Sequence, residues 1–115
     1  MKENRVYIEH ALQSITRIET YCRQGQQTFL DSSLIQDAVL RNLQTLSESM
    51  QRLSDDLKSE HQEVDWRAIS GFRNVLVHDY LGIDIQRIWH IIETDLPPLL
   101  LQLQRIKRTL PPPTD

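Results

Sequence analysis

The chain has 115 residues, three glycines and a formal net charge of −3 at pH 7. This length fits one domain, which we place at residues 1–110 with a proline-rich tail at 111–115. Few glycines beside many Leu, Ile, Gln, Arg and Glu residues predict an all-α fold. The negative charge excludes a uniformly basic nucleic-acid binder, so any RNA-binding surface has to be local or assembled by oligomerisation.

Cysteine and histidine usage gives no sign of a metal or disulfide framework. Cys22 is the single cysteine, and His10, His61 and His90 lie far apart without ligand spacing. No apolar run is long enough to span a bilayer, and the N-terminus lacks the apolar region of a signal peptide. We therefore expect a cytoplasmic protein without membrane contact, metal or cofactor.

The first half of the chain reads as two amphipathic helices. Residues 2–23 carry apolar side chains at spacings of three and four, and Gly25 ends this helix. A short segment follows up to Asp31. Ser33 and Gln36 then form a capping-box pattern that predicts the start of a second helix. Its apolar stripe continues through Leu57, over about six turns: Ile35, Val39, Leu43, Leu46, Met50, Leu53 and Leu57.

A polar line runs beside the stripe of this second helix. Asp37 and Arg41 belong to it and are four residues apart, so they can pair on the helix surface. Two interpretations stay open for them: an ordinary surface pair, or supporting residues that line the same groove as the motif described below.

The second half predicts two more helices and one interruption. Residues 58–63 read as a loop, after which Asp65 caps a third helix that begins at Trp66. Asp84 caps a fourth. Because proline lacks an N–H and clashes with the preceding turn, Pro97-Pro98 predicts a kink or a new helix near Leu96. The expected architecture is an antiparallel bundle of four to five helices with a kinked or split last helix.

The stretch 71–80 places reactive polar groups inside an apolar helical pattern. Arg73 and Tyr80 are seven apart and share a face, whereas Arg73 and His78 are five apart, about 140° round a regular helix. The arginine and the histidine therefore do not converge within one straight helix. Either the helix frays near His78, or a symmetry mate supplies a second copy of the motif.

The motif Arg73-Asn74-Val75-Leu76-Val77-His78-Asp79-Tyr80 resembles the Arg-to-His signature of HEPN domains. Asn after the Arg and Tyr two residues after the His resemble the HepT toxin branch. The stretches 36–43, 66–71, 82–84 and 89–97 are similar to that branch too, so the resemblance covers most of the chain.

The resemblance implies an all-helical, homodimeric ribonuclease toxin of a type VII-like toxin–antitoxin pair. Its expected partner is an MNT-type nucleotidyltransferase antitoxin, which silences such toxins by transferring AMP to the motif tyrosine, here Tyr80. Its expected substrate is RNA, tRNA in particular, cut without a metal. The alternative is a non-catalytic HEPN subunit that binds a nucleotidyltransferase and a nucleotide.

The residue types of the motif suit this chemistry on their own. RNA carries its own nucleophile, the 2′-hydroxyl. A metal-free nuclease therefore needs groups that transfer protons and a cation that faces the negatively charged phosphate. His78 suits proton transfer and Arg73 suits the phosphate, as the catalytic pair. Asn74 and Asp79 are candidates for supporting this catalytic pair. Tyr80 could hold a phosphate oxygen or fix the imidazole ring of His78. The plainer alternatives are a helix-end histidine, a salt-bridged arginine and a core tyrosine.

Overall fold

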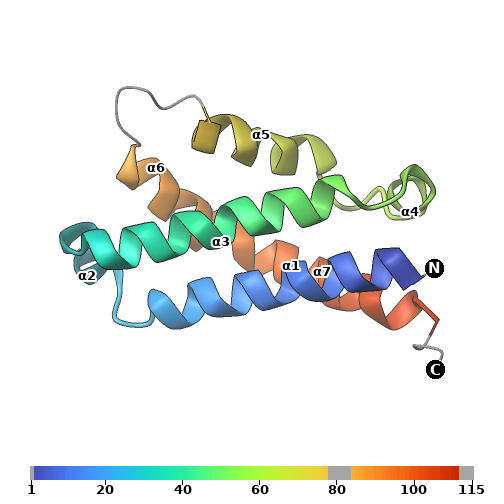
Figure 1. Cartoon of the computed structure of the whole chain (residues 1–115), viewed down its shortest axis with the longest axis horizontal. Coiled ribbons are helices and arrows are strands. Elements are labelled where there is room, and N and C mark those ends of the chain that lie inside the picture. Colours follow the sequence, from blue (N-terminus) through green and yellow to red (C-terminus); the bar gives the residue numbers. More distant parts are fainter. Residues whose placement is uncertain (1, 78–83, 112–115) are drawn as a thin grey trace.

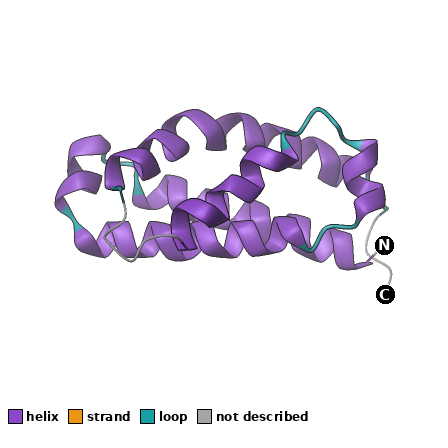
Figure 2. Ribbon diagram, turned by 90° about the horizontal axis from the view of Figure 1, so that it is seen from above, coloured by secondary structure: helices purple, strands orange, loops and turns teal. Residues whose placement is uncertain are grey.

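The computed structural model describes residues 2–77 and 84–111. For residues 2, 73–75 and 77 it describes the backbone but not the side chain. All regular secondary structure in these ranges is helical (Figure 2), which confirms the all-α fold class. None of the described helices is long and apolar enough to cross a membrane. The elements are α1 Lys2–Tyr21, α2 Gln26–Asp31, α3 Ser33–Gln51, α4 Asp55–Glu60, α5 Trp66–Val77, α6 Ile85–His90, the π-helical η1 Ile91–Asp95 and α7 Leu96–Thr109.

The long helix α3 lies between its two neighbours in the bundle. It runs antiparallel to α1 on one side and to α5 on the other, and α7 packs against α1 (Figure 1). The apolar stripe predicted for the first helix is buried, because Ile8, Ala11, Ile15 and Ile18 have no exposed surface. Apolar residues at spacings of three and four thus form one continuous core, as such a pattern predicts.

Gly25 ends the first helical segment, as the sequence predicts. Its φ of +99° lies in a region that side-chain-bearing residues rarely adopt, and its N–H donates to the carbonyl of Cys22 at 3.0 Å. The chain then turns into α2, whose Phe29 is buried in the core.

The cap of α3 differs from the predicted one. Ser32, not Ser33, is the N-cap, and its Oγ accepts from the N–H of Ile35 at 3.1 Å. The Gln36 side chain does not complete a capping box. Its Nε2 instead donates to the carbonyls of Phe29 and Leu30 at 3.0 and 3.1 Å, because the end of α2 leaves these acceptors within reach.

The predicted six-turn helix through Leu57 is wrong. The loop predicted at 58–63 is wrong for 58–60, which belong to α4, and right for 61–63, which lie outside any helix. Helix α3 ends at Gln51, and Ser54 caps the separate helix α4 by accepting from the N–H of Leu57 at 3.2 Å. Asn4 of α1 fixes the break: its Oδ1 accepts from the N–H of Ser54, and its Nδ2 donates to Ser54 Oγ, both at 3.0 Å. A serine whose backbone and side chain bond elsewhere does not continue a helix.

The interruption predicted near Leu96 is confirmed, and it takes the form of a π-helical turn. The N–H of Leu96 donates to the carbonyl of Ile91, five residues earlier. Pro97 and Pro98 follow as the first-turn residues of α7, where a missing N–H costs least. The last helix is therefore split where the prolines withdraw two donors from the regular ladder.

Candidate functional site

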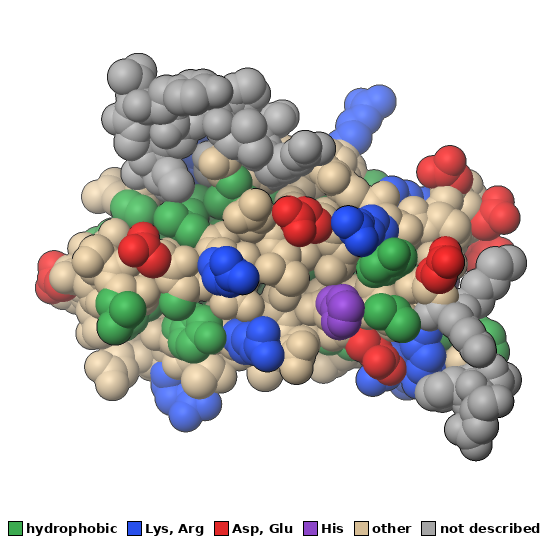
Figure 3. All heavy atoms as spheres, viewed as in Figure 1, with side chains coloured by type: hydrophobic (Ala, Val, Ile, Leu, Met, Phe, Trp, Pro, Cys, Tyr) green, Lys and Arg blue, Asp and Glu red, His purple; other side chains and the backbone are tan. Residues whose placement is uncertain are grey.

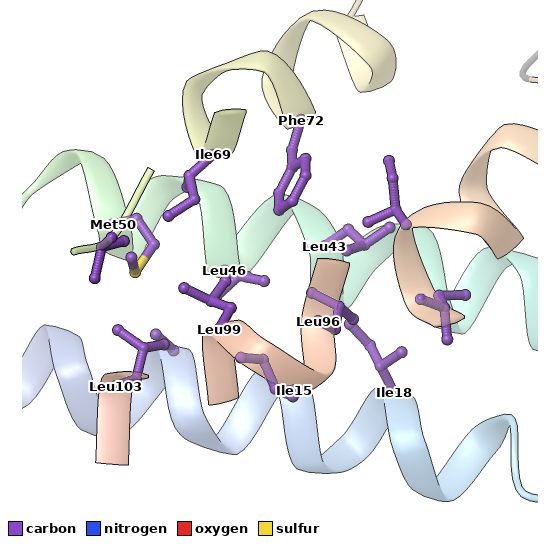
Figure 4. Packing of buried hydrophobic residues seen from close by; sticks show 14 of the residues in the cluster. Ile15, Ile18, Leu43, Leu46, Met50, Ile69, Phe72, Leu96, Leu99 and Leu103 are labelled. Atoms are coloured by element: carbon purple, nitrogen blue, oxygen red, sulfur yellow. The ribbon is translucent and has the colours of Figure 1, made fainter. Parts of the chain in front are cut away.

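Helix α5 carries the motif arginine, and its buried side lies on α3. Ile69 and Phe72 point from α5 into the core that Leu43, Leu46 and Met50 of α3 help to form (Figure 4), and each is only 6% exposed. Burial of two large apolar side chains fixes the rotation of the helix about its axis. The position of Arg73, directly after Phe72, is thereby set on the α5 backbone.

The beginning of α5 is held by three polar contacts. Asp65 caps it, as predicted, by accepting from the N–H of Ala68 at 3.0 Å. The indole Nε1 of Trp66 donates to the carbonyl of His61 at 3.0 Å, and the Lys58 ammonium lies 6.0 Å from the indole centroid. These contacts hold the helix at the end opposite to the motif.

The motif lies at the other end of α5. The backbone of Arg73 and Asn74 is helical, and α5 ends at Val77. His78, Asp79 and Tyr80 fall outside the described residues, and so does any contact among the motif side chains. The two readings of the sequence, a frayed helix or a site completed by a second copy, both stay predictions.

Helix α6, which follows the motif, begins at an N-cap residue, Asp84. The Asp84 carboxylate accepts from the N–H groups of Gln86 and Arg87 at 3.1 and 3.2 Å, as the sequence predicts. Trp89 then packs on Phe29 of α2, with ring centroids 5.4 Å apart. The end of α5 and the start of α6 lie on the same side of α3, over its N-terminal half (Figure 1).

The supporting candidates on α3 are exposed to solvent. Asp37 and Arg41 both lie on its solvent face, and among the described side chains neither forms an ion pair or a side-chain hydrogen bond. The surface pair that their spacing permits is therefore not formed. Their place on the N-terminal half of α3 puts them on the part of the helix that the end of α5 overlies.

The described surface has mixed charge. Figure 3 shows Lys and Arg side chains scattered singly over this face among uncharged, Asp and Glu side chains, without a continuous basic patch. Lys107 of α7 lies 3.8 Å from Glu9 of α1, and the Glu9 carboxylate also lies 3.3 Å from Arg5. Across the described part of the chain, no three metal-ligating side chains gather at one point.

The family model for HepT-like ribonucleases matches residues 11–106, which includes α5, the motif and α6. The chain belongs to this family. A relative from Thermococcus cleftensis, named "Probable ribonuclease HepT", is 28% identical over 93% of this chain and 98% of its own length. A relative from Caldanaerobacter subterraneus subsp. tengcongensis, named "Putative RNase TTE0752", is 31% identical over 92% of this chain and 96% of its own.

A third relative differs in length. It comes from Methanocaldococcus jannaschii, is named "Gamma-glutamylcyclotransferase and putative RNase MJ0434", and is 27% identical over 95% of this chain. The HepT-like chain spans half of that protein. No solved structure matches the HepT-like chain.

Sequence reasoning gave no separate role to Gly71. The glycine lies inside α5, one position before Phe72, and the signal that could have singled it out is a glycine in the middle of a strongly helical pattern.

Proposed function

We propose that this HepT-like protein is a metal-independent endoribonuclease, the toxin of a type VII-like toxin–antitoxin pair. The observation that carries the proposal is the match of the HepT-like ribonuclease family over 11–106, a range that contains the complete motif from Arg73 to Tyr80. The packing of α5 on α3 supports it, because a catalytic arginine needs a backbone that neighbouring elements hold in place.

The proposed reaction uses the RNA itself as nucleophile. His78 takes or delivers the proton, the 2′-oxygen bonds to phosphorus, and the bond from phosphorus to the 5′-oxygen breaks. Arg73 faces the non-bridging phosphate oxygens, whose negative charge grows in the transition state. The products are a 2′,3′-cyclic phosphate and a 5′-hydroxyl, which receives the proton. Asn74 and Asp79 orient the reacting groups, with Asp37 and Arg41 as further supporting residues.

A homodimer fits this chemistry. One histidine cannot act as acid and as base at the same moment, so two motifs brought together supply both functions. The RNA substrate that the proposal favours is tRNA. A monomer with full nuclease activity in sedimentation and cleavage assays would remove the need for a dimer.

Regulation is proposed at Tyr80. An MNT-type nucleotidyltransferase antitoxin transfers AMP to its hydroxyl, forming a bond from the tyrosine oxygen to the α-phosphorus of ATP and releasing pyrophosphate. The attached nucleotide adds bulk and negative charge two residues from His78, where substrate phosphate has to bind. We expect Tyr80→Phe to give a toxin that this antitoxin cannot modify, measured by intact mass and by growth after co-expression. Full neutralisation of the Phe variant would show that complex formation alone is sufficient.

The proposal is tested by incubating the purified protein with total tRNA in excess EDTA. Wild type is expected to cut RNA, and His78→Ala to lose at least 10²-fold in rate, in line with the usual effect of a positioned acid or base. His10→Ala is the matched control, because this exposed histidine lies on α1, an element outside the motif. No cleavage by a wild type whose Tyr80 is unmodified would favour the non-catalytic subunit that binds a nucleotidyltransferase.

A further inference from the structure

Helix α5 contains a glycine that the described structure does not require. Gly71 lies six residues into this 12-residue helix, where glycine is the poorest helix former except proline. A Cβ built at Gly71 would meet no heavy atom within 4 Å among the described residues. Its φ is not in the left-handed region either, since Gly25 is the one glycine with positive φ in the described ranges. Among the described residues, neither packing nor backbone conformation explains the missing side chain.

The open space at Gly71 lies on the side of α5 that faces away from the core. Arg67, Gly71 and Asn74 follow one another at spacings of four and three, so their Cα atoms line one side of the helix. Ile69 and Phe72, which are buried against α3, lie on the other side. A molecule that lies across this outer side reaches Asn74 and the motif end of α5 by passing over Gly71.

The chemistry of this outer side favours a nucleic-acid strand over a protein. The exposed side chains described on α5 are Arg67, Ala68 and Ser70. The Ser70 hydroxyl already donates to the carbonyl of Trp66 at 3.2 Å, so this side presents the Arg67 guanidinium and the Ala68 methyl group to a ligand. A protein interface needs large apolar or aromatic side chains at its centre. A sugar–phosphate strand needs positive charge, hydrogen-bond donors and room for close approach.

We infer that Gly71 is a positioning residue of the proposed ribonuclease, at which the sugar–phosphate backbone of bound RNA passes in van der Waals contact with the α5 backbone. The inference rests on the proposed function. Without a Cβ, the strand can lie nearer to the helix axis. A displacement of about 1 Å can cost 10²-fold in rate when a reacting group is moved out of line.

The test compares Gly71→Ala with Ser70→Ala in the full chain. Both variants replace a poorer helix former by alanine, so both should melt at or above the wild-type temperature. Only Gly71→Ala adds a methyl group on the proposed path of the RNA strand. Cleavage of total tRNA by Gly71→Ala should fall at least about tenfold, and Gly71→Val should fall further. Ser70→Ala should stay within about twofold of wild type. Equal cleavage by Gly71→Ala and wild type would overturn the inference and leave the proposed function intact.

Binding is measured separately, so that cleavage and contact are not confused. In a His78→Ala background, Gly71→Ala should raise the Kd for a fluorescent single-stranded RNA oligonucleotide at least about tenfold. An unchanged Kd would overturn the inference. A Gly71→Ala protein that sediments as a smaller species than wild type would also overturn it, by assigning the space to a second copy of the chain. A wild type that neither binds nor cuts RNA would overturn the proposed function first, and the inference with it.

Discussion

Cys22 follows the last turn of α1 with a thiol that is half-buried beside the core. Burial raises the pKa of this thiol to about 11, because a thiolate would lose hydration there. The thiol therefore behaves as a small apolar group, as unpaired buried cysteines commonly do. Its N–H continues the helix by donating to the carbonyl of Ile18 at 3.0 Å.

The raised pKa predicts slow chemistry at Cys22. At pH 8, a pKa of about 11 in place of the ordinary 9.0 leaves about 100-fold less thiolate. Iodoacetamide should therefore alkylate the native protein far more slowly than the denatured protein, followed by intact mass. The folded state also holds the thiol proton more tightly than the unfolded state, so stability should decline as the pH rises above about 9. Equal alkylation rates for native and denatured protein would contradict this account.

At the scale of elements, two helix boundaries are decided by single polar side chains. Asn4 bonds to both the N–H and the Oγ of Ser54, and so separates α3 from α4. Asp84 satisfies two N–H groups at the start of α6, directly after the residues 78–83 that follow α5. The contact of Asn4 with Ser54 sets where α3 ends. The Asp84 cap sets where α6 begins after the candidate site.

The contact of Asn4 with Ser54 predicts an energetic coupling between two distant segments. Asn4→Ala removes two hydrogen bonds and should lower the free energy of unfolding by about 1–2 kcal/mol, measured by urea denaturation. A double-mutant cycle with Ser54→Ala should give a coupling of at least about 0.5 kcal/mol. Additive losses in the cycle would mean that the two side chains act independently.

The caps of α5 and α6 predict a contrast between stability and activity. Asp65→Ala and Asp84→Ala each remove an N-cap and should each cost about 1 kcal/mol of stability. RNA cleavage should fall further for Asp84→Ala, because Asp84 lies at the motif end and Asp65 at the far end of α5. Thermal melts and cleavage rates of both variants give the comparison, and an equal loss of cleavage in the two would refute it.

For the whole molecule, net charge and surface pattern limit how RNA is held. The chain carries 16 Asp and Glu against 13 Lys and Arg residues, and its cations are dispersed over the described face (Figure 3). RNA binding at the proposed site therefore depends on a few local contacts. Long-range attraction, which a basic surface would provide, is expected to contribute little.

This charge distribution predicts a weak salt dependence of RNA binding. Each phosphate neutralised on a single strand contributes about −0.7 to the slope of log K against log salt concentration. We expect a slope shallower than about −3 for a His78→Ala variant titrated with single-stranded RNA at several NaCl concentrations. A much steeper slope would indicate a basic surface assembled from more than one copy of the chain.

The sequence by itself determined the features that depend on neighbours in the chain. Asp65 and Asp84 each cap the helix that begins directly after them, and the apolar stripe of α1 is buried as its spacing requires. Caps and helical periodicity act within a few residues, so a single sequence contains them completely. The motif from Arg73 to Tyr80 is likewise local, and its residues, together with the four further stretches, carried the resemblance to the family that the comparison then established.

Only the tertiary structure decided the features that depend on distant residues. The break at Ser54 requires Asn4, fifty residues earlier in the chain, and the pattern through Leu57 gave no sign of it. The space beside Gly71 is visible only once the neighbours of α5 are in place, because a sequence shows which side chain is missing but not what surrounds it. Long-range contacts are set by how helices pack, and packing is a property of the whole chain.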